Sequence, residues 1–255
     1  MTAIAIIHHL SSSGGTVFSK CIAAQPNVVL LSEVHPLIGR HEPIFMPFDP
    51  LVHLLVNYPE IGPSESEMNS LFLTRLEPVV RACERNGRKL VLRDHSHSDY
   101  LTDRSPRPRL AELLAEHYEL QRIVTFRNPI DAYLSMQSSG FDTYLTGFDD
   151  YCQRALKFLD DHKGLPLWTY EKFVSSPQKV IEDMCARIGI TFDAAFQERF
   201  CSVRLTGDSG RRPDKIQPLE RRSYSADFMR SVESSKAAGA IASRLGHDSQ
   251  QFFFC

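Results

Sequence analysis

Five short, mostly apolar runs recur along the chain, and they show no polar face of the kind that an exposed helix needs. They occupy residues 3–8, 28–33, 89–94, 121–128 and 166–170. Continuously apolar runs of this length are typical of parallel strands that are buried on both faces. The pattern therefore predicts five buried strands.

Helical periodicity fills the intervals between these runs. Ser64 begins the clearest helix, because Glu67 follows three residues later as in a capping box. Pro78 is expected to kink or divide this helix, since proline removes a backbone donor. Further helices are predicted at 16–25, 129–138, 148–162, 177–188 and 225–246. Strands that alternate with helices predict an α/β fold, with a central parallel sheet flanked by helices on both faces.

Composition narrows the class of protein. The 255 residues are 42% hydrophobic, which fits one domain over residues 1–255 with a substantial core. A formal net charge of −2 and a pI of about 6.6 argue against a nucleic-acid partner. The sequence shows no membrane span, no secretory signal and no CxxC spacing among its six cysteines. These features predict a cytoplasmic protein with reduced, mostly packed thiols.

The turn "SSSGGT" at residues 11–16 follows the first apolar run directly. A glycine turn between a strand and a helix presents backbone N–H groups at the positive end of the helix dipole, which suits an anion. Gly14 and Gly15 allow a close approach, and Ser13 and Thr16 add hydroxyl donors. No Lys precedes Thr16, so the turn departs from the pattern of nucleotide triphosphatases. By itself, a plain strand–helix turn explains it equally well.

A second candidate anion site lies in "TFRNPIDAYLSM". Arg127 ends a strand, Pro129 starts a helix, and Ser135 follows eight residues after the arginine. A guanidinium and a hydroxyl that converge at the end of a strand can hold a second phosphate. Either residue alone would be better explained by a structural role.

Together these stretches resemble the sulfotransferase superfamily, which uses 3′-phosphoadenosine 5′-phosphosulfate (PAPS). "SGGT" (13–16) is similar to the family's 5′-phosphosulfate loop, and "RNPIDAYLS" (127–135) to the segment whose Arg and Ser hold the 3′-phosphate. "TYEKFVSSP" (169–177) resembles the segment whose tyrosine, here Tyr170, approaches the adenine. "TGDSGRRPDK" (206–215) resembles the basic loop over the 3′-phosphate, with Ser209, Gly210 and Arg211 as the implied contacts. The resemblance implies a P-loop-like three-layer sandwich, with PAPS as co-substrate and no metal.

The chain also departs from the family pattern. Ser12, in the implied loop, stands where many members carry Lys or Arg, so His9, Arg93 or another basic group is expected to supply that charge. Val17 replaces the tryptophan that stacks on adenine in cytosolic members. The chain is therefore expected to be a divergent, bacterial-type member. Its acceptor, whether carbohydrate, lipid, small metabolite or peptide, is left open, and the variable segments 34–63 and 95–109 are expected to select it.

Two residues compete as the base that deprotonates the acceptor. Glu33 ends the second strand and resembles the glutamate base of tyrosylprotein and several bacterial sulfotransferases. His95 follows the third strand and resembles the KxH histidine of cytosolic members, with Arg93 in place of the lysine. Glu33 is slightly favoured, and Arg93 and His95 are expected to orient the acceptor or steady the sulfonate. Ordinary pKa values would place the acidic limb of the rate below about pH 5–6 for a carboxylate and near 6.5 for a histidine.

Three other interpretations stay open at this point. The histidines of "HH" (8–9) and "HSH" (95–97) are more simply structural or substrate-facing than ligands of a metal. A P-loop-type kinase is disfavoured, because neither a Lys before Thr16 nor a clear magnesium aspartate is present. A non-catalytic nucleotide-binding protein remains possible because the cation at position 12 is missing.

Overall fold

The computed structural model of the chain describes residues 2–37, 49–207, 215–218 and 220–246. Its centre is one sheet of five parallel strands in the order β2-β3-β1-β4-β5. The strands are β1 (Ala3–His8), β2 (Val28–Val34), β3 (Lys89–Asp94), β4 (Glu119–Phe126) and β5 (Leu167–Thr169). The predicted parallel sheet is therefore confirmed. Two strand ends differ from the prediction, because Arg127 lies just beyond β4 and Tyr170 begins a helix instead of ending β5.

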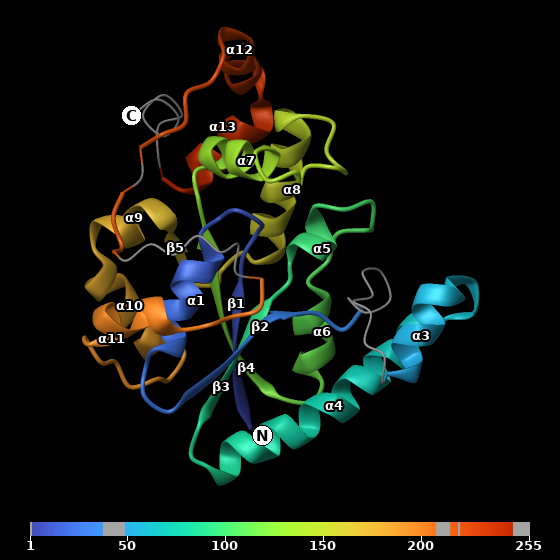
Figure 1. The fold of residues 1–255 in the computed structure, drawn as a ribbon. Helices are drawn as coiled ribbons and strands as arrows, with labels where there is room; N and C mark the ends of the chain where they lie inside the picture. The colour runs from blue at the N-terminus through green and yellow to red at the C-terminus, as the bar shows by residue number, and fades with distance from the viewer. Residues whose placement is uncertain (1, 38–48, 208–214, 219, 247–255) are drawn as a thin grey trace.

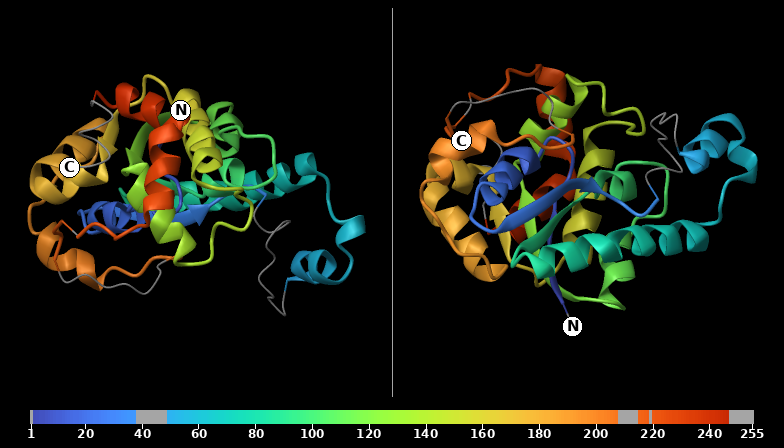
Figure 2. Two further views of the ribbon diagram at one scale, coloured as in Figure 1. Left: turned by 90° about the horizontal axis from the view of Figure 1, so that it is seen from above. Right: turned by 60° about the horizontal axis from the view of Figure 1, so that its bottom comes forward.

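Helices cover both faces of this sheet, as the views in Figure 1 and Figure 2 show. The helices are α1 (Gly15–Ala23), α3 (Pro50–Asn57), α4 (Glu65–Arg85), α5 (His97–Tyr100), α6 (Arg109–Ala115), α7 (Pro129–Gln137), α8 (Phe148–Asp161), α9 (Tyr170–Ser175), α10 (Pro177–Arg187), α11 (Phe196–Arg199), α12 (Ala226–Ser234) and α13 (Lys236–Arg244), with the 3-10 turns η1 (Pro59–Ile61) and η2 (Phe200–Ser202). The three-layer α/β architecture predicted from the sequence is confirmed.

Alternation along β1 explains how the layers are held. Ala5 and Ile7 point to one face and pack with α1, α9, α10 and α11. Ile4 and Ile6 point to the other face and pack with α4 and α6. Successive side chains of a strand face opposite sides, so a continuously apolar strand requires cover on both.

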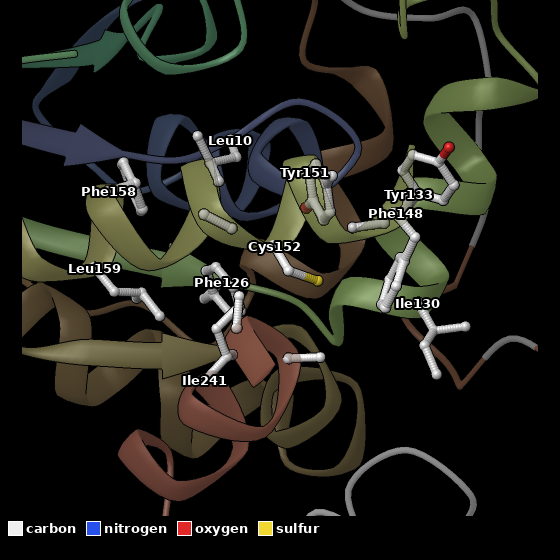
Figure 3. Close-up of a cluster of buried hydrophobic side chains, with 14 of the residues drawn as sticks. Leu10, Phe126, Ile130, Tyr133, Phe148, Tyr151, Cys152, Phe158, Leu159 and Ile241 are labelled. Atoms are coloured by element: carbon white, nitrogen blue, oxygen red, sulfur yellow. The ribbon is translucent and has the colours of Figure 1, made fainter. Parts of the chain in front are cut away.

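A third cluster packs α8 and α13 against the end of β4 (Figure 3). In this cluster, Phe126 of β4 lies beside side chains of α8 and beside Ile241 of α13. The same cluster includes Leu10, which is fully buried and directly precedes the glycine turn. The carboxyl ends of β1 and β4 are thereby fixed in one packed layer, and this is where the anion-binding residues were predicted.

Two expectations about the helices need correction. Pro78 does not divide α4, because Leu76, Val80 and other apolar side chains pack the helix against the sheet on both sides of the proline. The predicted helix 225–246 is divided into α12 and α13 at Ser235, which is extended and caps α13 by accepting from the Ala238 N–H. The expectation of mostly packed thiols is confirmed, because four of the five described cysteines are buried and Cys201 alone among them is exposed.

The fold does not test several of the predictions made from the sequence. None of the described helices has the length and apolar character needed to cross a membrane. A cytoplasmic location, a single domain and the roles of segments 34–63 and 95–109 remain predictions. Within the second segment, the buried α5 places Ser98, Asp99 and Tyr100 beneath the surface.

Candidate active site

A cavity of about 640 Å³ opens at the carboxyl ends of β1, β2, β3 and β4. It is lined by residues from the glycine turn, α1, the ends of β2 and β3, Arg127 after β4, the end of α7, and the segment that precedes residue 208. Open α/β sheets bind ligands at this end of the strands, where the connecting segments diverge. Most residues predicted to be functional lie in its wall.

The glycine turn adopts the conformation of an anion cradle. Gly14 has φ +83° and caps α1, and no side chain among the described residues caps the first turn of the helix. Ser12 is also left-handed, with φ +59°. A Cβ on Gly14 would lie 2.4 Å from the Tyr170 ring, and one on Gly15 would lie 2.4 Å from the His9 ring. Both glycines are therefore required by the packing of neighbouring rings.

Ser13 does not present its hydroxyl to the cavity. Its side chain is buried and donates to the Leu10 carbonyl at 2.7 Å, which holds the turn closed. Ser12, Gly14, Gly15 and Thr16 do line the cavity. Ser13 therefore shapes the cradle, whereas its neighbours are the residues that face the cavity and could contact a ligand.

His9 is a neutral donor and acceptor and not the substitute cation considered for position 12. Its Nδ1 lies 2.9 Å from the Leu10 carbonyl, which can only accept, so Nδ1 carries the proton. Its Nε2 accepts from Arg93 Nε at 2.9 Å. Burial, and then the nearby Arg93 guanidinium, lower the pKa of His9 well below its usual value. That expectation about His9 was wrong.

Arg127 and Ser135 converge on the cavity, as their spacing predicts. The Arg127 guanidinium lies 4.7 Å from the centre of the Tyr170 ring, and its Nη1 donates to the Ser12 carbonyl at 3.4 Å. Its buried Nε has no hydrogen-bond partner among the described residues. Glu171 supports this arrangement by accepting from the Asn128 N–H at 2.9 Å. A partnerless, buried guanidinium donor beside the cradle fits an anionic ligand.

Glu33 occupies a strained position at the end of β2. Its φ is +58°, and the pairing register of β2 with β3 shifts between Leu31 and Val34, as in a β-bulge. Such a bulge turns a side chain that would otherwise follow the strand's alternation. Gly207 (φ +70°) packs directly on this carboxylate, since a Cβ there would lie 2.4 Å from Glu33 Cγ. A non-glycine residue with positive φ stores strain, which proteins retain mostly at functional sites.

Arg93 lines the cavity and holds Glu33 in place. It forms an ion pair with Glu33 Oε1, donates from Nη1 to Ser32 Oγ at 2.8 Å, and donates from Nε to His9. Its side chain is buried. With all three nitrogen positions engaged by protein groups, Arg93 orients the carboxylate. Ser32 in turn donates to the Thr206 carbonyl, which fixes the segment that carries Gly207.

The local environment reverses the ordinary order of the pKa values of the two candidate bases, Glu33 and His95. Burial raises the pKa of Glu33 to about 7, despite the opposing effect of Arg93. Burial and then the nearby His35 lower the pKa of His95 to about 4. His95 Nδ1 lies 2.5 Å from Ser98 Oγ, and its Nε2 lies 3.5 Å from Glu33 Oε2. At neutral pH the carboxylate is the stronger base of the pair.

His97 lies beside these two residues, although no role beyond the "HSH" motif was predicted for it. Its ring centre lies 3.6 Å from that of His95, and its Nδ1 is buried without a hydrogen-bond partner among the described residues. Glu33, His95 and His97 offer ligand atoms that all lie within 4.8 Å of one another, so they could hold a divalent metal. The same unpartnered atoms, Glu33 Oε2 and His97 Nδ1, also suit the hydroxyl of an acceptor.

Sequence reasoning missed Lys20. This lysine is buried on α1, one helical turn after Thr16, and lines the cavity beside the cradle. The four-residue spacing from Thr16 was the available signal, because residues i and i+4 share a helix face. Ser209, Gly210 and Arg211, which the resemblance assigns to the 3′-phosphate, lie outside the described residues.

Comparison with known proteins identifies the fold. No protein-family model and no curated protein matches the chain. Among solved structures, it is similar to the sulfotransferase domain of the Synechococcus PCC 7002 olefin synthase (TM-score 0.59, 16% identity, 91% of this chain and 94% of that one). It is also similar to the sulfotransferase domain of the curacin biosynthetic pathway (0.60, 14%, 97% and 99%) and to mouse sulfotransferase SULT7A1 complexed with PAP (0.50, 13%, 94% and 84%). The chain has the sulfotransferase fold over nearly its whole length.

Proposed function

We propose that the protein transfers the sulfonyl group of PAPS to a hydroxyl or amine acceptor. One observation carries the proposal. A single cavity combines an anion cradle, a second cationic site with Arg127 and Ser135, and a carboxylate whose pKa of about 7 suits proton transfer at neutral pH. The sulfotransferase fold and the sequence motifs support the same activity.

The chain's own groups would hold PAPS at both of its anionic ends. Backbone N–H groups of Gly15 and Thr16 at the start of α1 would bind the 5′-phosphosulfate, and Lys20 would add positive charge that Ser12 cannot. Arg127 and Ser135 would bind the 3′-phosphate, joined by Ser209, Gly210 and Arg211 on the evidence of the sequence resemblance. Bound PAPS supplies an activated sulfonyl group with PAP (3′,5′-adenosine bisphosphate) as its leaving group.

Glu33 would act as the general base. As the acceptor oxygen forms its bond to sulfur, its proton passes to the Glu33 carboxylate, and the bond from sulfur to the phosphate oxygen breaks to release PAP. Arg93 and Gly207 hold the carboxylate in place. His95 and His97, neutral at pH 7, would orient the acceptor hydroxyl instead of accepting its proton, since burial lowers the pKa of both.

Thermal stability with added nucleotides tests the proposal against its alternatives. A ligand that binds only the folded state raises the melting temperature, and at equal concentration a tighter ligand raises it more. PAP should stabilise the protein more than ADP or ATP does. Preference for ATP would support a kinase, and no shift with any of the three would support a protein without this cofactor. Transfer of label from [35S]PAPS to an acceptor then separates an enzyme from a protein that only binds PAP.

A further inference from the structure

We infer that the side chains around the candidate base also form a binding site for a divalent transition metal, with Zn²⁺ as the best match, and that metal bound there inhibits the transfer reaction. The site, here called the base-side metal site, consists of Glu33, His95 and His97. The binding stands on geometry alone. The inhibition rests on the proposed function, because it acts on the groups that would handle the acceptor's proton.

The three side chains of this site meet where two neighbouring strands end. Glu33 lies at the bulged end of β2, His95 directly follows β3, and His97 begins α5 (Figure 1). All three line the cavity, so an ion can reach them. No other group of three or more carboxylate, imidazole and thiol side chains in the described parts of the chain is close enough to share an ion.

The spacing of the ligand atoms fits one small cation. They lie within 4.8 Å of one another, and His95 Nε2 lies 3.5 Å from Glu33 Oε2. A tetrahedral zinc ion with ligands at about 2.0–2.2 Å brings the ligand atoms to about 3.3–3.6 Å from one another. The first pair already has this spacing, so the site closes when His97 approaches slightly.

Two of the ligand atoms are buried without a hydrogen-bond partner among the described residues. They are Glu33 Oε2 and His97 Nδ1. A buried acceptor without a partner costs free energy, which a bound ligand recovers. The other carboxylate oxygen, Glu33 Oε1, is held by Arg93, so the free oxygen has a fixed position.

His95 is oriented in the way that metal-binding histidines are. Its Nδ1 lies 2.5 Å from Ser98 Oγ. Histidine ligands almost always donate one ring N–H to an outer partner, which fixes the tautomer and directs the lone pair of the other nitrogen at the metal. When Nδ1 donates to Ser98, the lone pair of Nε2 is available beside Glu33 Oε2.

The ligand set and its surroundings select the metal. Two imidazoles and one carboxylate suit Zn²⁺ and neighbouring transition metals, whereas Mg²⁺ prefers oxygen ligands and keeps several of its waters. Arg93 places a positive charge beside the site. The buried carboxylates of Asp94 and Asp99 act on His95 in the opposite sense and offset that charge.

Metal at this site would block the proposed reaction at its proton-transfer step. The ion occupies Glu33 Oε2, the oxygen that is left to take the acceptor's proton, and the lone pairs of the histidines that would orient the acceptor. Proton and metal compete for the same carboxylate, so the metal-bound form is a much weaker base. Arg127 and Ser135, which would hold the 3′-phosphate, are not ligands, and the loss should therefore appear in kcat.

Titration of the untagged protein with Co²⁺ and Zn²⁺, after EDTA treatment and dialysis, tests the binding without turnover. Co²⁺ should give the visible absorption of a low-coordinate nitrogen and oxygen site, Zn²⁺ should remove it, and Mg²⁺ should not. His95→Ala and His97→Gln should each weaken Zn²⁺ affinity by more than about tenfold. Even the loss of an outer partner of a ligand typically costs about 10–100-fold, and Ser98→Ala should fall in that range.

Two matched controls remove a metal-binding group that lies outside the site. Cys201→Ser removes the exposed thiol in the cavity wall, and His117→Ala removes an exposed histidine that is not among the described lining residues. Both variants should bind Zn²⁺ as wild type does. Equal Zn²⁺ affinity of wild type, His95→Ala and His97→Gln, with the variants shown to be folded by circular dichroism, would overturn the site.

Turnover with labelled PAPS separates this inference from the proposed function. Zn²⁺ should inhibit transfer and EDTA should restore it, and His97→Gln, whatever its own rate, should need more than about ten times as much Zn²⁺ for half-inhibition. Zinc that binds these residues and raises the rate would overturn the inhibitory role. If zinc binds but zinc-free protein transfers no label, the proposed function fails and the metal site stands. If label is transferred and these residues bind no zinc, the metal site is wrong and the sulfotransferase proposal stands.

Discussion

The two halves of the cavity are built in different ways. The cofactor half consists of the glycine turn with Arg127 and Ser135, and it is rich in donors, with a guanidinium nitrogen that has no partner in the described chain. The base half, around Glu33 and Arg93, is buried, internally hydrogen-bonded and strained. The first half is arranged to receive an anion. In the second half, the surrounding protein groups by themselves raise the pKa of one carboxylate, Glu33, to about 7. Substitutions should therefore affect binding in one half and turnover in the other.

Glu33→Gln should produce the largest effect. The amide keeps the size of the side chain and can still bond to Arg93, but it cannot take the acceptor's proton. Removal of a general base typically lowers kcat by about 10²–10⁴, and PAP affinity should stay near that of wild type. His95→Ala should cost less and should act mainly on KM. If the glutamine variant turns over normally while the alanine variant is inactive, the base is His95.

Arg127→Ala should affect the cofactor half alone. Loss of a charge-assisted contact should weaken PAP binding by roughly 1.5–3 kcal/mol, which is about 10- to 150-fold. Adenosine 5′-phosphosulfate lacks the 3′-phosphate and should bind the variant and wild type equally, as titration calorimetry can measure. An equal loss for both ligands would show that Arg127 instead supports the fold, through its contacts with Tyr170 and Ser12.

Gly207→Ala should disturb the base without changing its chemistry. The new Cβ would lie 2.4 Å from Glu33 Cγ, so the carboxylate must move, and kcat should fall by roughly tenfold. Gly164→Ala is the matched control, because Gly164 also has positive φ (+86°) but a Cβ there would meet nothing within 4 Å. Both variants should lose comparable stability and only the first should lose turnover. In the Glu33→Gln background, Gly207→Ala should have no further effect on kcat, and an additive loss would contradict this positioning role.

The pH profile gives a smaller and independent distinction. Burial favours the protonated form of Glu33, so its carboxylate is available only as pH rises through about 7. The kcat/KM value should therefore decline below pH 7, by about tenfold for each further unit. This reverses the expectation from ordinary pKa values, which placed the acidic limb of the profile at a lower pH for a carboxylate base than for a histidine base. A limb near pH 4 would assign the base role to His95.

Chelation should have the smallest effect. The proposed reaction uses N–H groups and side-chain cations to stabilise the leaving phosphate, so EDTA should leave the turnover of zinc-free protein unchanged. A loss that added Zn²⁺ restores would show instead that turnover requires a metal at Glu33, His95 and His97, whose ligand atoms lie within 4.8 Å of one another. Variants of His97 would then lower metal content as measured by mass spectrometry.

The sequence by itself determined the layered α/β fold and most of the cofactor half. Continuously apolar strands must be covered on both faces, and the turn at 11–16 and the helix start at 127–135 are each made by neighbouring residues. Local geometry depends on local sequence, so such motifs can be recognised without the structure. The same reasoning failed at Pro78 and Ser235, where packing and a cap overrode or interrupted helical periodicity.

Only the tertiary structure decided the base half. Glu33, Arg93 and Gly207 come from segments far apart in the chain, and their contacts arise only when β2, β3 and the segment before residue 208 meet. The sequence supplied the residue types, but it could not show that Arg93 points to the carboxylate, that His9 is neutral, or that Lys20 reaches the cavity. Nor could the sequence show which of Glu33 and His95 has the higher pKa. A pKa depends on burial and on neighbouring charges, which the assembled fold alone provides.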